Sequence, residues 1–117
     1  MCFSGSTGKP KGILHTTGGY MLYTFITFKY TFNYTSGDVF FATADMGWID
    51  GHSLTVYGGL ANGATMVLMS GTPIYPDPSR LWRIVERLNV NHLSIAPTVI
   101  RILKKFGEQY VRPFNRD

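Results

Sequence analysis

The chain has 117 residues, of which 44% are hydrophobic, and this is enough apolar material for one domain with a core. Its formal net charge of +4 comes from scattered basic residues, which excludes the basic stripe of a nucleic-acid-binding protein. A lone cysteine, Cys2, excludes an internal disulfide and is typical of a reducing, cytoplasmic compartment. Lys29 and several threonines interrupt the aromatic-rich stretch 18–34, so we expect no membrane span.

The segment 4–12 is the most distinctive part of the sequence. It combines three glycines, three hydroxyl side chains and two lysines around one proline. Glycines allow backbone N–H groups to turn inward into an anion-binding nest, and the hydroxyls and lysines add donors and positive charge. This composition predicts a loop that binds polyphosphate. The alternative is a flexible Gly/Ser turn, but two lysines and a proline at fixed places argue against it.

The spacing in this segment differs from a Walker A loop. That motif needs four residues between its glycines, followed by Lys and then Ser or Thr. Here two residues separate Gly5 from Gly8, and Lys9 precedes Pro10.

The rest of the chain alternates short apolar runs with helical patterns. The run 39–43 is apolar almost throughout, which is typical of a parallel strand that is covered on both faces. The stretch 71–78 holds three prolines and is expected to be a loop. We expect strands at 11–16, 39–43, 65–69 and 92–96, and helices at 19–33, 53–60, 79–88 and 97–106. The alternation predicts an α/β fold in which parallel-sheet strands alternate with flanking helices.

Two details of the helix at 79–88 follow from its residue types. Ser79 precedes the apolar positions and is expected to cap the helix. Arg80, Arg83 and Arg87 are expected to form its solvated face.

The loop 45–53 is the second candidate site. It follows the strand expected at 39–43, and ligands of open α/β sheets bind at loops that leave the carboxyl ends of strands. Gly47 and Gly51 flank Trp48 and permit a tight path, which places Trp48 to wall a small pocket. The alternative is that Trp48 belongs to the core. His52 is expected to be structural, because the sequence supplies no partner for acid–base work.

Taken together, these segments resemble the acyl-adenylate-forming enzymes. The stretch 4–12 is similar to their phosphate-binding loop, and Gly47-Trp48 with Gly51-His52-Ser53 is similar to the acetyl-CoA synthetases and other short-chain members. Fatty acyl and amino-acid activating members usually differ at 47–53. The similarity continues through residues 15–20, 43–46, 57–58, 60–65, 96–98 and 100–101.

The resemblance implies an AMP-forming ligase, most closely an acetate–CoA ligase, that converts a carboxylate, ATP and coenzyme A into acyl-CoA, AMP and diphosphate. It implies Mg²⁺ that arrives with ATP, and it assigns no catalytic side chain or metal ligand to this chain. The carboxylate is expected near Trp48, Ile49 and Asp50, and coenzyme A near Asp50 and Ile74. The ATP phosphates are expected at Ser4, Gly5, Ser6, Thr7, Gly8, Lys9 and Lys11.

Three residues depart from the family pattern. Relatives usually have threonine in place of Phe3 and Asp50, and asparagine in place of Ile74. A carboxylate at position 50 would repel a carboxylate substrate unless it is paired or protonated, so acetate specificity does not follow from the resemblance.

The resemblance also implies an incomplete domain. Members of the family are several times longer, so we expect residues 1–117 to be a partial AMP-binding domain, truncated at both ends, from the large N-terminal domain of such an enzyme. The family's adenine-binding segment, its Tyr-Gly-x-Thr-Glu motif and its C-terminal lysine find no match, and we expect this piece alone to be inactive. The alternatives are a non-catalytic remnant that binds nucleotide or phosphate, and a propionyl-type acyl-CoA synthetase.

Overall fold

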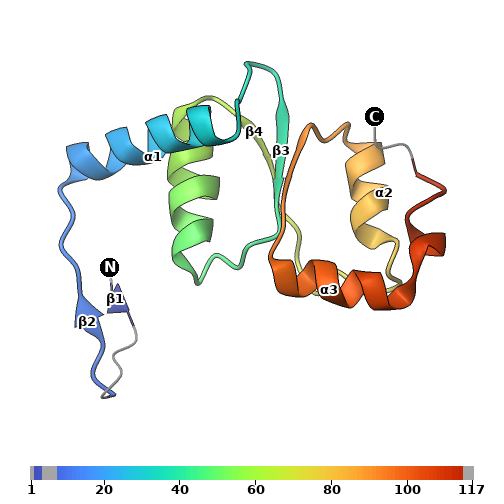
Figure 1. Ribbon diagram of the computed structural model, residues 1–117. Helices are drawn as coiled ribbons and strands as arrows, with labels where there is room; N and C mark the ends of the chain where they lie inside the picture. The colour runs from blue at the N-terminus through green and yellow to red at the C-terminus, as the bar shows by residue number, and fades with distance from the viewer. Residues whose placement is uncertain (1, 4–7, 115–117) are drawn as a thin grey trace.

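The computed structural model in Figure 1 describes residues 2–3 and 8–114. Three parallel strands form a sheet in the order β4-β3-β5, while β1 and β2 pair antiparallel and lie apart from that sheet (Figure 1). The elements in chain order are β1 Cys2–Phe3, β2 Lys11–Gly12, α1 Thr17–Thr31, β3 Val39–Ala42, the π-helix η1 Gly51–Gly59, β4 Thr65–Val67, α2 Arg80–Arg87, β5 His92–Ser94, α3 Pro97–Phe106 and the 3₁₀-helix η2 Glu108–Tyr110.

The central strand β3 is buried on both faces, as its apolar sequence predicts. On one face, Phe40 and Ala42 pack with Phe28 of α1. On the other face, Phe41 packs with Leu81 of α2 and Leu103 of α3. The helices α1 and η1 therefore cover one side of the sheet, and α2 and α3 cover the other (Figure 1). This arrangement confirms the expected α/β fold.

Element boundaries differ from the expectation near the N-terminus. The strand expected at 11–16 is limited to Lys11–Gly12, and Leu14 beyond it is 97% exposed. The first helix begins earlier than expected, because the Thr16 hydroxyl accepts a hydrogen bond from the Gly19 N–H at 3.3 Å and caps it.

The helix expected at 53–60 is a π-helix, η1, that spans Gly51–Gly59. Its glycines permit close packing against α1, since a Cβ on Gly58 would lie 2.9 Å from the Thr24 carbonyl oxygen and 3.0 Å from Phe28 Cβ. A Cβ on Gly51 would lie 2.7 Å from the Asp45 carbonyl oxygen. π-Helical turns are rare in proteins, and those that occur are often found at functional sites. The π-helix η1 and the loop before it are therefore a candidate ligand-binding region.

The start of α2 corrects one expectation about its cap. Ser79 occupies the N-cap position, but its hydroxyl makes no capping bond to the helix. Instead, the hydroxyl donates to Asp77 Oδ1, which also accepts the Ser79 N–H at 2.8 Å. Arg83 donates to Asp77 Oδ2 at 2.8 Å. Asp77 therefore organises this helix start, because a carboxylate accepts several bonds at once.

Arg80 corrects the expectation of a fully solvated arginine face. Its guanidinium donates to three carbonyl oxygens of the preceding loop, at 2.7 Å from Ser70, 2.9 Å from Thr72 and 3.0 Å from Tyr75. The proline-rich loop has few backbone donors of its own, so its carbonyls need partners from elsewhere. Arg80 ties the loop to α2, whereas Arg87 is exposed as expected.

Within the described residues, no helix is both long and apolar enough to cross a lipid bilayer.

Candidate functional site

The expected phosphate-binding loop lies between β1 and β2. Gly8 adopts φ +88°, a conformation that side chains disfavour and that turns the backbone as an anion nest requires. Lys9 and Lys11 are exposed, so both ammonium groups can reach a ligand in solvent. The other members of the set, Ser4, Gly5, Ser6 and Thr7, lie outside the described residues.

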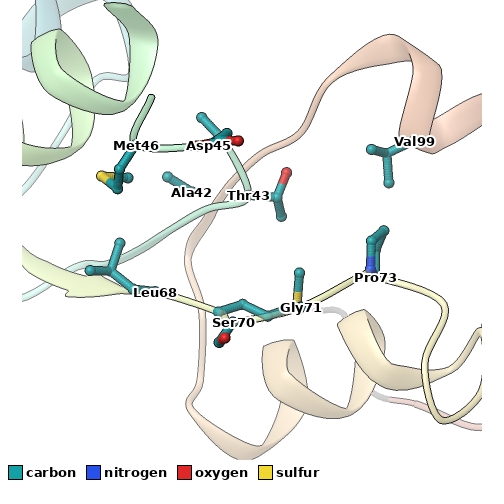
Figure 2. Close-up of a pocket in the computed structure, with 11 residues that line it drawn as sticks. Ala42, Thr43, Asp45, Met46, Leu68, Ser70, Gly71, Pro73 and Val99 are labelled. Carbon is teal, nitrogen blue, oxygen red and sulfur yellow. The ribbon is translucent and has the colours of Figure 1, made fainter. Parts of the chain in front are cut away.

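An open cavity of about 620 Å³ lies at the carboxyl ends of β3 and β4. Figure 2 shows Thr43, Gly71, Pro73 and Val99 around it. The Thr43 hydroxyl donates to the Ser94 carbonyl oxygen at 3.2 Å, which fixes the exit of β3 to the neighbouring strand β5. Another border of the cavity is formed by the loop whose Ser70 and Thr72 carbonyl oxygens accept hydrogen bonds from Arg80. The complete lining is Ala42, Thr43, Ala44, Asp45, Met46, Leu68, Met69, Ser70, Gly71, Pro73 and Val99.

A smaller cavity of about 190 Å³ lies at the carboxyl ends of β3 and β5, next to the start of η1. Ala42 and Ala44 line both cavities, so the exit of β3 borders the two at once. The polar side chains of the smaller cavity come from Asp50, Thr55 and Ser94. Both cavities occupy the edge of the sheet at which the sequence places its ligand loop.

The three residues expected near the carboxylate are placed differently from one another. Trp48 is 72% exposed and is not part of the core that the described residues form. Neither Trp48 nor Ile49 lines the two cavities, and their contact with substrate stays a prediction. Asp50 lines the smaller cavity. Asp45, in the same loop, instead accepts a hydrogen bond from the Gly47 N–H at 2.7 Å and thereby shapes the loop.

Ile74, expected near coenzyme A, is half-buried and packs against the apolar cluster of Phe41, Leu81 and Leu103. It follows Pro73, which lines the larger cavity. Its contact with coenzyme A stays a prediction.

Sequence reasoning missed two features of the site. Thr55 is buried in the smaller cavity, although its place in an apolar helical pattern gave no sign of this. His52 lines a third hollow of about 380 Å³ with His15, Tyr20 and Tyr57. Tyr20 of that lining also contacts η1, since the Tyr20 and Ser53 hydroxyl oxygens lie 2.6 Å apart and share a hydrogen bond between α1 and η1.

Two carboxylates away from the cavities have lowered pKa values. The pKa of Asp38 lies below its ordinary value of 3.8, chiefly because the His92 side chain bonds to it at 2.9 Å. The pKa of Asp77 is lowered chiefly by its hydrogen bond from the Ser79 hydroxyl, with help from the Ser79 N–H and Arg83. Both groups are structural, since they tie a turn to β5 and a loop to α2.

The fold and cavities define a class of protein. A parallel sheet covered by helices defines the α/β class, in which ligands bind beyond the carboxyl ends of the strands, where both cavities of this chain lie. The profile of the AMP-binding enzyme family matches residues 3–115. The chain therefore belongs to the AMP-binding enzyme family.

Curated relatives include the acetyl-coenzyme A synthetase of Syntrophus aciditrophicus, 57% identical over 93% of this chain and 17% of the relative. The chloroplastic/glyoxysomal acetyl-coenzyme A synthetase of Arabidopsis thaliana is 55% identical over 97% of this chain and 15% of the relative. A crystal structure of a Brucella canis acyl-CoA synthetase superposes with a TM-score of 0.80 at 28% identity, covering 94% of this chain and 19% of that chain. The chain thus spans less than a fifth of the length of these relatives.

Proposed function

We propose that this chain is the phosphate-binding and acyl-site portion of an AMP-forming acid–thiol ligase, with acetate–CoA ligase as its reaction. One observation carries the proposal: relatives called acetyl-coenzyme A synthetases are 52–57% identical over 93–97% of the chain. The matched region includes both cavities and the loop of Gly8, Lys9 and Lys11.

The proposed reaction has two steps. First, an oxygen of the carboxylate attacks the α-phosphorus of ATP, a P–O bond forms, and diphosphate leaves. Second, the coenzyme A thiol loses its proton and attacks the acyl carbon, and AMP leaves. Neither step requires a covalent bond to the protein, so the chain acts by holding the reactants in line and stabilising charge.

The phosphate loop supplies that charge stabilisation. We propose that backbone N–H groups and hydroxyls of residues 4–8, together with Lys9 and Lys11, bind the β- and γ-phosphates. Their donors oppose the negative charge that builds on the leaving diphosphate. Mg²⁺ would be held mainly by phosphate oxygens and water, because residues 2–3 and 8–114 contain no cluster of three metal-binding side chains.

The two cavities fit the remaining reactants. The smaller, of about 190 Å³, has the volume of about six water molecules and suits a short acyl group. The larger, of about 620 Å³, is open and is lined by Pro73, the residue before Ile74, which suits the pantetheine end of coenzyme A. We also propose that the chain is part of the AMP-binding domain of a longer, cytoplasmic protein.

A chimera tests the proposal. The 117 residues replace the matching segment of the Syntrophus aciditrophicus relative, and the unmodified relative serves as the control. We expect acetate-dependent exchange of label between ATP and diphosphate, followed by acetyl-CoA formation when coenzyme A is added. Exchange that is faster with propionate would instead assign a propionyl-type enzyme. A folded chimera that binds ATP but forms no AMP with either acid would support a non-catalytic phosphate-binding role.

A further inference from the structure

The smaller cavity contains a buried hydroxyl without a partner. Thr55 of η1 is 2% exposed, and its Oγ1 makes no hydrogen bond with any described residue. Burying a hydroxyl without a partner lowers the stability of a fold. Because Thr55 lines a cavity, a bound molecule can supply the missing partner. The hydroxyl therefore indicates that this cavity receives a ligand with a polar group.

Asp50 places a negative charge at the same cavity. It immediately precedes η1, its side chain makes no capping bond to that helix, and none of the described residues forms an ion pair with it. Ser94 adds a second hydroxyl, and the rest of the lining is apolar, with Phe40 and Leu54 among its members. The cavity thus pairs an apolar wall with one carboxylate and two hydroxyls.

This set of groups selects among small acids. An ionised carboxylate only accepts hydrogen bonds, so a ligand that satisfies Asp50 must present a donor. The carbon chain of acetate offers none, whereas the repulsion between Asp50 and a substrate carboxylate acts on all such acids alike. An acid with a hydroxyl or amino group on its chain gives Asp50 a donor. It also gives Thr55 a polar partner, and a compact acid fits a cavity of about 190 Å³.

We propose that Asp50 and Thr55 make the smaller cavity a selective subsite for a short carboxylic acid that carries a hydroxyl or amino group on its carbon chain. The inference rests on the proposed function, because it names an acid that the ligase would activate more efficiently than acetate. It assigns Asp50 to specificity, and Thr55 to holding the polar group within the cavity.

A binding experiment on the 117-residue chain tests the subsite directly. Glycolate, glycine and acetate are titrated into ¹⁵N-labelled chain, and the amide signals of Asp50 and Thr55 are followed. We expect glycolate or glycine to bind about tenfold more tightly than acetate, the effect of one charge-assisted hydrogen bond in a partly exposed site. Comparing the affinities for glycolate and glycine shows whether the subsite prefers a hydroxyl or an ammonium group. Equal binding of all three acids would overturn the subsite.

Variants separate specificity from folding. Asp50→Asn should remove the tenfold preference, whereas Glu108→Gln, which removes one carboxylate charge on the exposed η2, should keep it. Thr55→Val keeps the shape of the side chain and should raise the melting temperature of the free chain while weakening glycolate binding. A Thr55→Val chain that is less stable and binds glycolate unchanged would assign the hydroxyl to the fold and overturn the proposal.

The chimera supplies a second, kinetic test. We expect Asp50→Thr to lower the ratio of kcat/KM for glycolate over acetate by about tenfold. A chimera that activates acetate and glycolate equally, before and after the change, would refute the subsite and leave the ligase intact. Conversely, if the chimera forms no AMP with any acid while the labelled chain still binds glycolate at Thr55, the subsite is supported and the ligase assignment fails.

Discussion

We propose that Lys9 supplies the positive charge that the first step needs most. It follows Gly8, whose positive φ turns the backbone, and its side chain is exposed to solvent. In the chimera, we expect Lys9→Ala to slow acetate-dependent ATP–diphosphate exchange by roughly two to three orders of magnitude, or about 3–4 kcal/mol in the transition state. Radiolabelled diphosphate exchange measures this rate.

The half-reaction that starts from synthetic acetyl-adenylate provides the internal control for Lys9→Ala. Diphosphate has already left in that reaction, so it should slow far less. Lys105→Ala, which removes an exposed lysine in the last turn of α3, should leave both rates unchanged. Equal slowing of both half-reactions by Lys9→Ala would show that the lysine supports the fold or coenzyme A binding instead.

The absence of a side chain at Gly58 allows η1 to pack closely against α1. A Cβ at this residue would lie 2.9 Å from the Ser53 and Thr24 carbonyl oxygens. We expect Gly58→Ala to force η1 away from α1 and to reduce the free energy of unfolding by about 1–3 kcal/mol. Gly18→Ala is the matched control, because no atom lies within 4 Å of its Cβ and alanine favours the helix. Urea unfolding measures the stability of both variants. Equal stabilities would mean that the packing of η1 does not require the close approach of Gly58 to α1.

At the scale of elements, α2 and the loop before it act as one unit through Arg80. The loop also borders the larger cavity, so its order matters for the site. We expect Arg80→Ala to lower stability by about 1–3 kcal/mol and to speed hydrogen exchange in residues 70–75, because three carbonyls lose a charged donor. Arg87→Ala, on the exposed side of the same helix, should change neither quantity. Unchanged exchange after Arg80→Ala would show that the loop keeps its shape unaided.

The elements also show what a sequence can and cannot predict here. The apolar run of β3 predicts burial on both faces because no polar side chain interrupts it, and the position of the ligand loop follows from strand order. The close approach of Gly58 to α1 joins segments that are far apart in sequence, so no local pattern could predict it. Thr55 lies in an apolar pattern, so a buried hydroxyl without a partner was not predictable from it.

At the scale of the whole molecule, the chain is open. Its radius of gyration is 16.2 Å, against about 13 Å for a compact chain of this length. The β1–β2 pair lies apart from the sheet (Figure 1). Large apolar side chains such as Leu14, Tyr30 and Tyr75 are more than two-thirds exposed. The outer strands β4 and β5 leave sheet edges without a partner strand among the described residues. Surfaces of this kind favour association with other segments or chains.

Acid sensitivity of the whole fold follows from Asp38 and Asp77. Asp38 bonds to His92 across 54 residues of sequence and so ties the turn before β3 to β5, while Asp77 ties the proline-rich loop to α2. Both pKa values lie below the ordinary 3.8, which means that the folded state favours the ionised carboxylates.

The contribution of these carboxylates to stability is therefore present above about pH 3.8 and is lost as the pH falls through the lower values of the folded state. We expect the free energy of unfolding to fall between about pH 5 and pH 2, and to fall less steeply in Asp38→Asn, which cannot ionise there. Urea unfolding at a series of pH values measures both slopes. If Asp38→Asn and the parent chain lost stability in parallel, the bond between Asp38 and His92 would not contribute to holding the sheet together.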